Sequence, residues 1–377
     1  MRLIPFVAAA VAAVAVLTGG IASAAGAERG PRVSPQFDGT VYTTAYLGET
    51  VYVGGSFGNA IVGGRSVARS RLAAFDARTG ALLNWAPNAD DTVRALATDG
   101  HAVYVAGDFS RISGAKRDSL AKLDATSGAV DAFSHAIAGS PVTLAVQGSR
   151  LYVGGRFTQI DSSRRANLAA FDTATGALDA RWTPTTDDAV ESIAAGKGRV
   201  YLGGSFHKTG NVSNSLRLTA VDPVTGALDK GFQPRPEAVV HSVAVGADGT
   251  VYAGMGGQGG RAAAYAPDGR QRWLRVFDGD VQAVAALGDV AYVGGHFDRA
   301  CKTARNGSQG VCTDGSLSRV KLAAVDGSGR LLDWAPQANG IVGVRTLTAA
   351  EPLRQVVAGG EFTMVAGASW KRLAVFG

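Results

Sequence analysis

Acidic residues recur at one position of this chain and are the first candidates for chemistry. The chain repeats a strand that begins with valine, and the residue three places before that valine is acidic in five of seven copies. The seven residues at this position are Asp38, Asp90, Gly139, Asp187, Glu237, Asp278 and Asn339. If the strands line a channel, these carboxylates ring its mouth and suit calcium or a cationic ligand group. Alternatively, the Asp and Asn side chains cap the turn into the strand by bonding backbone amides.

A second variable position follows a repeated pair of glycines. Its residues differ in charge and size between repeats, and they are Ser56, Asp108, Arg156, Ser205, His296 and Glu361. Among these we expect Arg156 and His296 to contact a ligand, although exposed loop starts vary in any case. The predicted binding residues are therefore Asp38, Asp90, Asp187, Glu237, Asp278, Arg156 and His296.

The residue types needed for common catalytic and metal sites are scattered. The five histidines fall on different repeats without the spacing of a zinc site, and they are His101, His135, His207, His241 and His296. No nucleophile elbow of the GxSxG type occurs, and glycoside hydrolysis would need a facing pair of carboxylates that the pattern does not single out. We therefore assign no catalytic residue, no metal ligand and no cofactor, with calcium as the one candidate ion.

The elements that must position these residues are short strands in a repeat of four apolar runs. The second run is centred on an aromatic or valine before the glycines, at Tyr52, Tyr104, Tyr152, Tyr201, Tyr252, Tyr292 and Val357. A third run such as Leu72–Asp76 leads into a Thr-Gly or Ser-Gly turn, where the aspartate can bond amides two residues on. The fourth carries a bulky ring expected to wedge between neighbouring repeats, at Trp85, Phe133, Trp182, Phe232, Trp273 and Trp334.

A repeat of this size must stack on its neighbours to bury its apolar face, which predicts an all-β fold. Seven copies predict a seven-bladed β-propeller with four-stranded blades over residues 25–377. The last copy stops after its third run at Gly377. We expect residues 25–38, with Val33–Asp38 as the pairing segment, to pair with Leu373–Phe376 and close the ring, which removes two open edges.

Loop lengths indicate which face binds ligands. The connections between first and second strands and between third and fourth strands are tight. Those between second and third strands are long and unlike one another, for example Ser56–Arg71 and His296–Val320. The long loops emerge on the same face as the connections that enter each first strand. Because binding residues tend to lie on variable loops of a rigid scaffold, we place the site on that face.

The N-terminus and the cysteines indicate export. Residues 1–24 combine a charged start, an apolar run and an Ala-Ser-Ala pattern, which predicts a signal peptide cleaved near Ala24 and a secreted protein. The apolar run is shorter than the roughly 20 residues of a membrane-spanning helix. Cys301 and Cys312 are expected to form a disulfide, although a metal site is the alternative. The net charge of +6 is scattered, so we expect no nucleic-acid partner.

The repeat resembles three propeller families. The glycine pair and the tryptophan of the fourth run are similar to kelch repeats, and Ala73–Trp85 resembles the tryptophan-docking motif of quinoprotein dehydrogenases. Leu228–Pro234 and the Val-Gly-Gly-x-Phe run resemble the delta-sixty-type repeats of exported bacterial proteins of unknown function, over essentially the whole mature chain. The quinoprotein resemblance implies a related fold, and this chain lacks the adjacent cysteines that often accompany the quinone.

Taken together, these features predict a non-catalytic, monomeric, exported propeller. It would bind an extracellular protein or polysaccharide through the face that carries the long loops. The alternative is an enzyme on the same scaffold, either a glycan hydrolase or lyase with carboxylates at the channel mouth or a quinone-dependent oxidoreductase. A perturbed pair of carboxylates deep in the channel would favour the enzyme.

Overall fold

The alternating apolar and polar residues at the start of each repeat form strands, as predicted. The computed structural model describes residues 30–377, so the expected signal peptide and the first residues of the closing segment lie outside it. The first strands of the repeats are β2 (Val41–Leu47), β7 (Val93–Thr98), β12 (Ile137–Gln147), β16 (Val190–Gly196), β21 (Val240–Val245), β25 (Val281–Leu287) and β30 (Val344–Ala350). The sequence placed the last of these at Val342, two residues too early.

Each first strand pairs antiparallel with a second strand, and the second pairs with a third. The second strands are β3 (Thr50–Gly55), β8 (Ala102–Gly107), β13 (Arg150–Ile160), β17 (Arg199–Gly204), β22 (Val251–Met255), β26 (Val290–Gly295) and β31 (Gln355–Gly360). The third strands are β6 (Leu72–Asp76), β11 (Leu120–Asp124), β15 (Leu168–Asp172), β20 (Leu218–Val221), β23 (Gly260–Tyr265), β29 (Leu322–Val325) and β34 (Leu373–Phe376). Residues 30–377 also contain two short 3₁₀ helices, η1 (Ser308–Gly310) and η2 (Glu351–Leu353).

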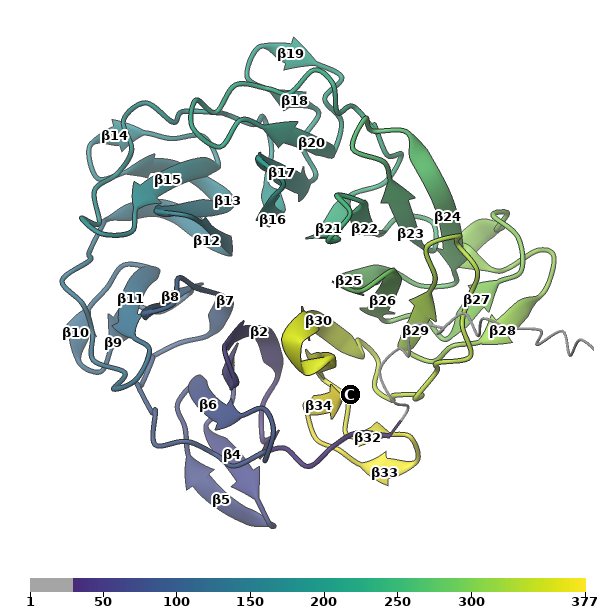
Figure 1. Ribbon diagram of the computed structural model, residues 1–377, viewed down its shortest axis with the longest axis horizontal. Helices are drawn as coiled ribbons and strands as arrows, with labels where there is room; N and C mark the ends of the chain where they lie inside the picture. The colour runs from purple at the N-terminus through teal and green to yellow at the C-terminus, as the bar shows by residue number, and fades with distance from the viewer. Residues whose placement is uncertain (1–29) are drawn as a thin grey trace, which may run out of the picture.

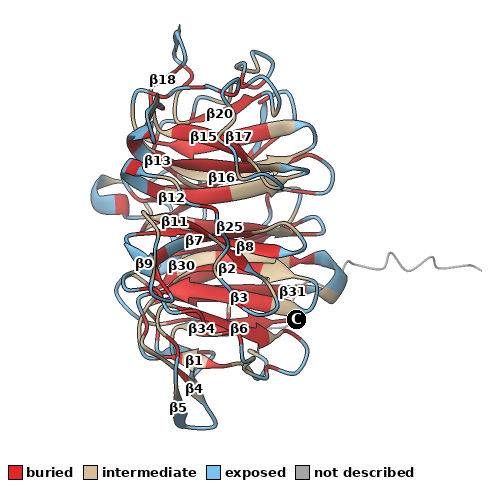
Figure 2. Ribbon diagram, turned by 90° about the vertical axis from the view of Figure 1, so that its left-hand side faces the viewer, coloured by how far each residue is buried: buried red, intermediate tan, exposed pale blue. Residues whose placement is uncertain are grey.

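The sheets stand around a central axis with their first strands innermost (Figure 1). Consecutive first strands contact one another from β2 through β7, β12, β16, β21 and β25 to β30, and β30 in turn contacts β2. This is the arrangement of a β-propeller. The strands are mostly buried and the loops are mostly exposed (Figure 2).

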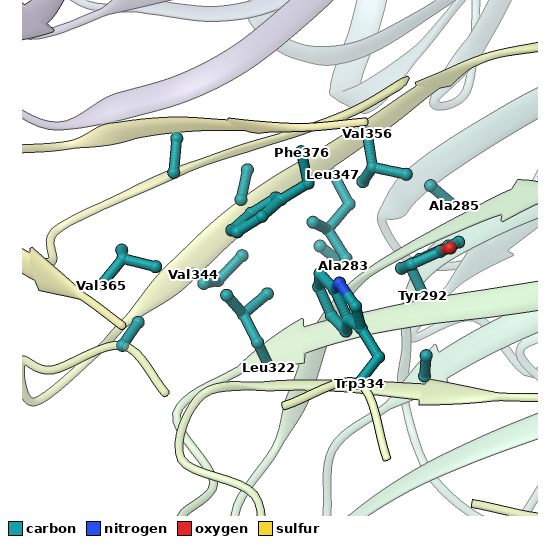
Figure 3. Packing of buried hydrophobic residues seen from close by; sticks show 14 of the residues in the cluster. Ala283, Ala285, Tyr292, Leu322, Trp334, Val344, Leu347, Val356, Val365 and Phe376 are labelled. Atoms are coloured by element: carbon teal, nitrogen blue, oxygen red, sulfur yellow. The ribbon is translucent and has the colours of Figure 1, made fainter. Parts of the chain in front are cut away.

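The core lies between neighbouring sheets, where the predicted rings wedge. Trp334 packs edge-on against Tyr292 of its own repeat at 4.9 Å and against Phe376 of the next repeat at 5.2 Å between ring centroids (Figure 3). Trp85 packs in the same way on Tyr52, and its indole nitrogen donates to the carbonyl oxygen of Asp124 in the next sheet. The rings therefore join adjacent sheets, which confirms the prediction for them.

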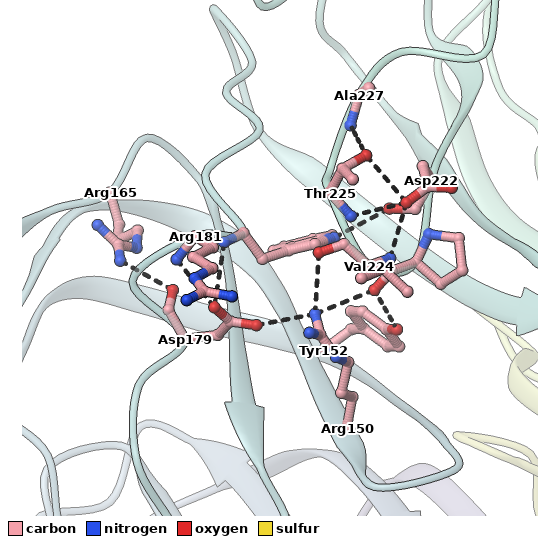
Figure 4. A network of polar contacts seen from close by, with 11 residues as sticks. Arg150, Tyr152, Arg165, Asp179, Arg181, Asp222, Val224, Thr225 and Ala227 are labelled. Carbon is pink, nitrogen blue, oxygen red and sulfur yellow. Dashed lines mark hydrogen bonds and ion pairs between the residues drawn. The ribbon is translucent and has the colours of Figure 1, made fainter.

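The turn after the third strand is also confirmed. The Asp222 carboxylate accepts hydrogen bonds from the backbone amides of Val224 and Thr225 and from the Thr225 hydroxyl, and Gly226 has a φ of 71° (Figure 4). Arg150 of the preceding sheet forms an ion pair with Asp179 at 2.8 Å and donates to the carbonyl oxygen of Pro223. The turn therefore fixes its own geometry and is tied to the preceding sheet.

The sequence predicted a full fourth strand in every repeat, but most fourth segments are not regular strands. Within residues 30–377, only β24 (Gln271–Phe277) is a regular fourth strand, and it pairs with β23. Elsewhere the segment makes a single bridge, as between Phe75 and Leu82. In three of these segments an aspartate side chain accepts a hydrogen bond from a backbone amide of its own segment, so that amide does not pair with the neighbouring strand. The aspartates are Asp131, Asp179 and Asp229.

The long loops are less varied than their sequences indicated, because most contain a short hairpin behind a buried phenylalanine. The hairpins are β4 (Asn59–Val62) with β5 (Arg65–Ala68), β9 (Arg111–Ile112) with β10 (Ala115–Lys116), the end of β13 with β14 (Ser163–Arg164), β18 (Lys208–Thr209) with β19 (Val212–Ser213), β27 (Arg299–Cys301) with β28 (Ser316–Ser318), and β32 (Met364–Val365) with β33 (Ala368–Ser369). The buried phenylalanines are Phe57, Phe109, Phe157, Phe206, Phe297 and Phe362.

The β21 sheet lacks such a hairpin, and the cysteine loop of the next repeat covers its place. Cys301 and Cys312 form the expected disulfide. Within the enclosed loop, the Asn306 side chain donates to the carbonyl oxygen of Gln258, whose own side chain donates to the carbonyl oxygen of Gly307 at 2.9 Å. The long insertion therefore has a packing role against the turn between β22 and β23.

The N-terminal segment joins the first and last repeats, although not by the pairing that was predicted. Arg32 bridges Val375 of β34, whereas β1 (Gln36–Phe37) pairs with β4 of the first repeat. The Phe37 amide also donates to the carbonyl oxygen of Lys371 at 3.1 Å. The expected pairing of Val33–Asp38 with Leu373–Phe376 is thus replaced by one bridge at Arg32, because β1 takes the edge of the hairpin.

Candidate functional site

A repeated β-bulge brings side chains from different repeats together at the axis. In every pair of first and second strands, the register shifts by one residue near the start of the first strand. A bulge of this kind redirects the extra side chain. The residues in the bulges are Tyr42, Arg94, Val142, Glu191, His241, Gln282 and Arg345, and together with Asp280 they line one pocket of about 330 Å³.

A pair of glycines accompanies five of the seven bulges. A Cβ on Gly55 would lie 2.1 Å from the Thr40 carbonyl oxygen, and a Cβ on Gly54 would lie 2.5 Å from Cγ1 of Val93 in the next sheet. Only glycine allows the backbones to approach this closely. The Ser56 amide then donates to the same Thr40 oxygen at 2.9 Å. The prediction of a close backbone approach or bulge at the glycines is confirmed.

One side of the pocket carries two arginines around a tyrosine, on the neighbouring strands β30, β2 and β7. The Tyr42 ring has the Arg94 guanidinium 5.6 Å and the Arg345 guanidinium 5.9 Å from its centroid. Arg94 forms an ion pair with Asp108 at 2.6 Å, and Arg345 forms one with Glu361 at 3.1 Å. Both arginines use Nε and Nη2 for these bonds, which leaves the Nη1 edge for another acceptor.

The other side of the pocket carries two carboxylates and an imidazole, from Glu191 on β16, His241 on β21 and Asp280 just before β25. His241 Nδ1 lies 2.6 Å from Oε2 of Glu191, and Asp280 lies 3.9 Å from His296 Nδ1. Burial disfavours the charged imidazole of His241, but the hydrogen bond and charge of Glu191, with the charge of Asp280, raise its pKa above the usual value. This side can therefore present both a protonated imidazole and carboxylate acceptors.

Of the two predicted residues after the glycine pairs, only His296 is in contact with a residue that lines this pocket. His296 contacts Asp280, as described, and its side chain is 43% exposed. Arg156 forms an ion pair with Asp188, the residue two places before β16, and its side chain is 73% exposed. A ligand role for both residues stays a prediction.

Most residues of the predicted acidic ring form hydrogen bonds with backbone amides of the hairpins. Asp187 Oδ1 accepts the amides of His207 and Lys208 at 2.8 Å each, where the hairpin strand β18 begins. The equivalent residues repeat these two bonds on their own hairpins, and they are Asp38, Asp90, Asp278 and Asn339. The side-chain to backbone bonds expected for capping are therefore present, but they fix the hairpin about twenty residues later and not the turn into the first strand.

Hydrogen bonding also holds the pKa of these carboxyls low. Burial raises the pKa of Asp90, but hydrogen bonds from the Ser110 hydroxyl and from the amides of Ser110 and Arg111 outweigh burial and lower it. The pKa of Asp38 is lowered for the same reason. Both side chains are therefore ionised at neutral pH and already bonded. Their role in binding stays a prediction.

Two repeats depart from this acidic pattern. In the third repeat, Asp161 of the hairpin accepts the Ala136 amide at 2.9 Å and the His135 imidazole, so the acid lies on the opposite partner. Glu237 precedes β21, whose sheet has no hairpin, and it is exposed. No group of three or more His, Cys, Asp or Glu side chains within residues 30–377 is arranged to hold a metal ion. No helix in that range is long and apolar enough to cross a membrane.

Sequence reasoning missed all eight residues that line the pocket. His296, which it did identify, lies against the lining residue Asp280. The available signal was the second residue of the first strand in six of the seven repeats, which is Tyr, Arg, Glu, His, Gln or Arg where an alternating strand would keep one chemical type. In the seventh repeat the predicted first strand began two residues too early, so this comparison did not single out Arg345.

Comparisons with known proteins support the fold only. No family model matches the chain, and no curated protein matches it. Among solved structures, the WD40 beta propeller domain of Doa1 is similar, with a TM-score of 0.58, 10% sequence identity and coverage of 92% of this chain and 96% of that one. The computationally designed Ika8 protein aligns with a TM-score of 0.49 at 15% identity, covering 92% of this chain and 99% of that one.

Proposed function

We propose that this chain is a seven-bladed propeller that binds an extracellular ligand, protein or polysaccharide, at the mouth of its central channel without catalysing a reaction. The observation that carries the proposal is the ring of bulges. It directs one side chain from each first strand into a single polar pocket, on the face that also carries the hairpins. Pockets that gather polar groups at such a convergence are the usual ligand sites of rigid scaffolds.

The blade count and the closure of the ring rest on the strand contacts. Each of the seven repeats contributes a first, a second and a third strand, and the contact of β30 with β2 joins the last repeat to the first. The bridge between Arg32 and Val375 adds an N-terminal residue to the last sheet. We propose that these contacts close the ring over residues 25–377, as one monomeric domain.

Export and family remain part of the proposal. The leader pattern of residues 1–24 and the Cys301–Cys312 disulfide support a secreted protein, since disulfides persist in oxidising compartments. The whole-chain resemblance to delta-sixty-type repeats supports membership of that group of exported propellers. N-terminal sequencing of protein recovered from the culture medium should begin at Ala25, and protein retained in the cells with an intact leader would contradict export.

A ligand screen with matched variants tests the site. Binding raises the melting temperature because ligand stabilises only the folded state, so we would screen extracellular glycans and proteins by thermal shift. A true ligand should lose its shift when the Arg94–Asp108 pair is removed by Arg94→Ala and Asp108→Ala together. The control removes the exposed Arg78–Glu49 pair of the opposite face. A shift that survives the first change, or that both changes abolish equally, would contradict binding at the mouth.

One observation favours the alternative of an enzyme. The Glu191–His241 pair lies inside the pocket with Asp280 beside it, and a carboxylate that orients an imidazole is a common arrangement for proton transfer. If this alternative holds, a bound glycan is cleaved, new reducing ends accumulate and Glu191→Gln stops their release. We expect no such release during prolonged incubation with wild-type protein.

A further inference from the structure

The charges around the channel mouth are paired with one another. Every charged residue that lines the pocket belongs to an ion pair, and the four pairs are Arg94–Asp108, Arg345–Glu361, His241–Glu191 and His296–Asp280. A charged ligand group that approaches one member of a pair is repelled by the other member, which carries the same charge as the ligand, and this repulsion opposes its binding. A hydroxyl group can donate to the carboxylates and accept from the guanidinium and imidazole groups at the same time.

A neutral side chain in the ring also lacks a partner. Gln282 occupies the bulge of β25, and its Oε1 atom is buried with no hydrogen-bond partner in the described chain. A buried acceptor of this kind costs free energy until a donor reaches it. Because an amide offers both a donor and an acceptor, a hydroxyl group satisfies it in either orientation of the amide.

Two positions of the ring are apolar or aromatic. Val142 occupies the bulge of β12, and the Tyr42 ring lies between Arg94 and Arg345. An occupant must therefore combine an apolar surface with a rim of hydroxyl groups. The volume of about 330 Å³ lies at the small end of ligand pockets, which are commonly about 300–1,000 Å³, so it suits one or two rings of a longer chain.

We propose that the channel mouth binds a neutral sugar residue of an extracellular polysaccharide. This inference rests on the proposed function, because it names the ligand of the same site. The bulge residues on both sides of the pocket supply donors and acceptors to its hydroxyl groups, with Gln282 as the neutral contact. Tyr42 and Val142 face the C–H surface of the ring.

The test measures binding of purified protein to tetrasaccharides by calorimetry. The neutral probes are tetramers of glucose, mannose, galactose and N-acetylglucosamine, and the charged probes are tetragalacturonate and tetraglucosamine. We expect at least one neutral probe to bind, with a dissociation constant that changes by less than about twofold between about 0.05 and 0.5 M NaCl, because salt screens ionic attraction and leaves neutral contacts.

Matched substitutions then locate the contact. Gln282→Glu removes the amide donor and adds a carboxylate without a cationic partner, which a bound sugar would have to desolvate, so it should weaken neutral binding at least about tenfold. Gln271→Glu makes the same change at an exposed residue, the first of β24, and should leave binding intact. Thermal unfolding verifies that both variants fold, and Gln282→Met serves as a second test if Gln282→Glu does not.

The outcomes separate this inference from the proposed function. One outcome is that only a charged probe binds, and that its binding is lost in Gln282→Glu or Gln282→Met but kept in Gln271→Glu. That outcome would overturn the neutral sugar as the ligand, while the channel mouth would remain the site. Neutral binding that survives both Gln282 changes would overturn the site as well. A third outcome is that no tetrasaccharide binds, while a protein ligand loses its thermal shift in the variant with Arg94→Ala and Asp108→Ala. That outcome would overturn the sugar as the ligand and leave the channel mouth as the site.

Discussion

At the scale of single residues, one side-chain type performs the same task in successive repeats. Asp38, Asp90, Asp187 and Asp278 each hold two amides of a hairpin about twenty residues later, and Asn339 does so with its amide oxygen. Because an asparagine serves at the same position, the task needs an acceptor oxygen and not a negative charge. This favours a structural role for the acidic position.

Substitution of Asp187 separates the two roles. Asp187→Ala removes the acceptor for His207 and Lys208 and should lower the free energy of unfolding by about 1 kcal/mol, the usual contribution of such bonds. Asp187→Asn keeps an acceptor and should cost less. Urea unfolding at neutral pH measures both. Equal losses for the two variants would show that the charge matters and would restore the carboxylates as candidate ligands.

The pocket histidine should titrate above its usual value. The pKa of His241 is raised from 6.5 by Glu191 and Asp280 despite burial, so the stabilisation is fully present below the unfolded pKa and is lost as pH rises through the folded pKa. NMR titration of the imidazole should give a midpoint above 6.5, and Glu191→Gln should lower it. A midpoint that Glu191→Gln leaves unchanged would contradict the pairing.

At the scale of elements, local patterns were predictable and pairings were not. The strands, the aspartate turns such as Asp222 to Gly226 and the close approach at the glycine pairs follow from residue type and spacing. The bulges depend on the register between two strands, so within a single repeat nothing marked Glu191 or Gln282 as an extra residue, and only a comparison between repeats could have shown the varying position. The hairpins escaped notice because strands of two residues, such as Lys208–Thr209, are too short for alternation to show.

The disulfide loop is an element whose contribution can be measured. Cys301 and Cys312 enclose a loop that packs on the turn of the preceding sheet, and closing a loop of this length contributes about 3 kcal/mol by the chain-entropy account. Cys301→Ser with Cys312→Ser should lower the free energy of unfolding by that order, and proteases should cleave first within residues 302–311. Unchanged stability and cleavage elsewhere would show that the loop does not stabilise the β21 sheet.

At the scale of the whole molecule, the seam between the last and first repeats decides whether the ring is closed. A Cβ on Gly359 of β31 would lie 2.5 Å from Cγ1 of Val41 across this seam, and a Cβ on Gly54 would lie 2.5 Å from Cγ1 of Val93 across an internal seam. The sequence predicted closure by the N-terminus, but it could not give the register, because the partners are more than three hundred residues apart.

These two glycines provide a matched test of closure. Gly359→Ala and Gly54→Ala should each destabilise the protein by about 1–3 kcal/mol through overpacking of a tight contact. Thermal unfolding of both variants under identical conditions makes the comparison. If Gly359→Ala is tolerated while Gly54→Ala is not, the last and first sheets are not packed as a closed ring requires.

The central claim is that ligand binds the ring of bulges and not the acidic position beside the hairpins. The most direct measurement is calorimetric titration of the ligand found in the screen into wild-type protein, Gln282→Glu and Asp187→Asn. The account predicts that Gln282→Glu weakens binding at least about tenfold while Asp187→Asn leaves it within about twofold. The reverse result, with binding lost in Asp187→Asn and kept in Gln282→Glu, would contradict it.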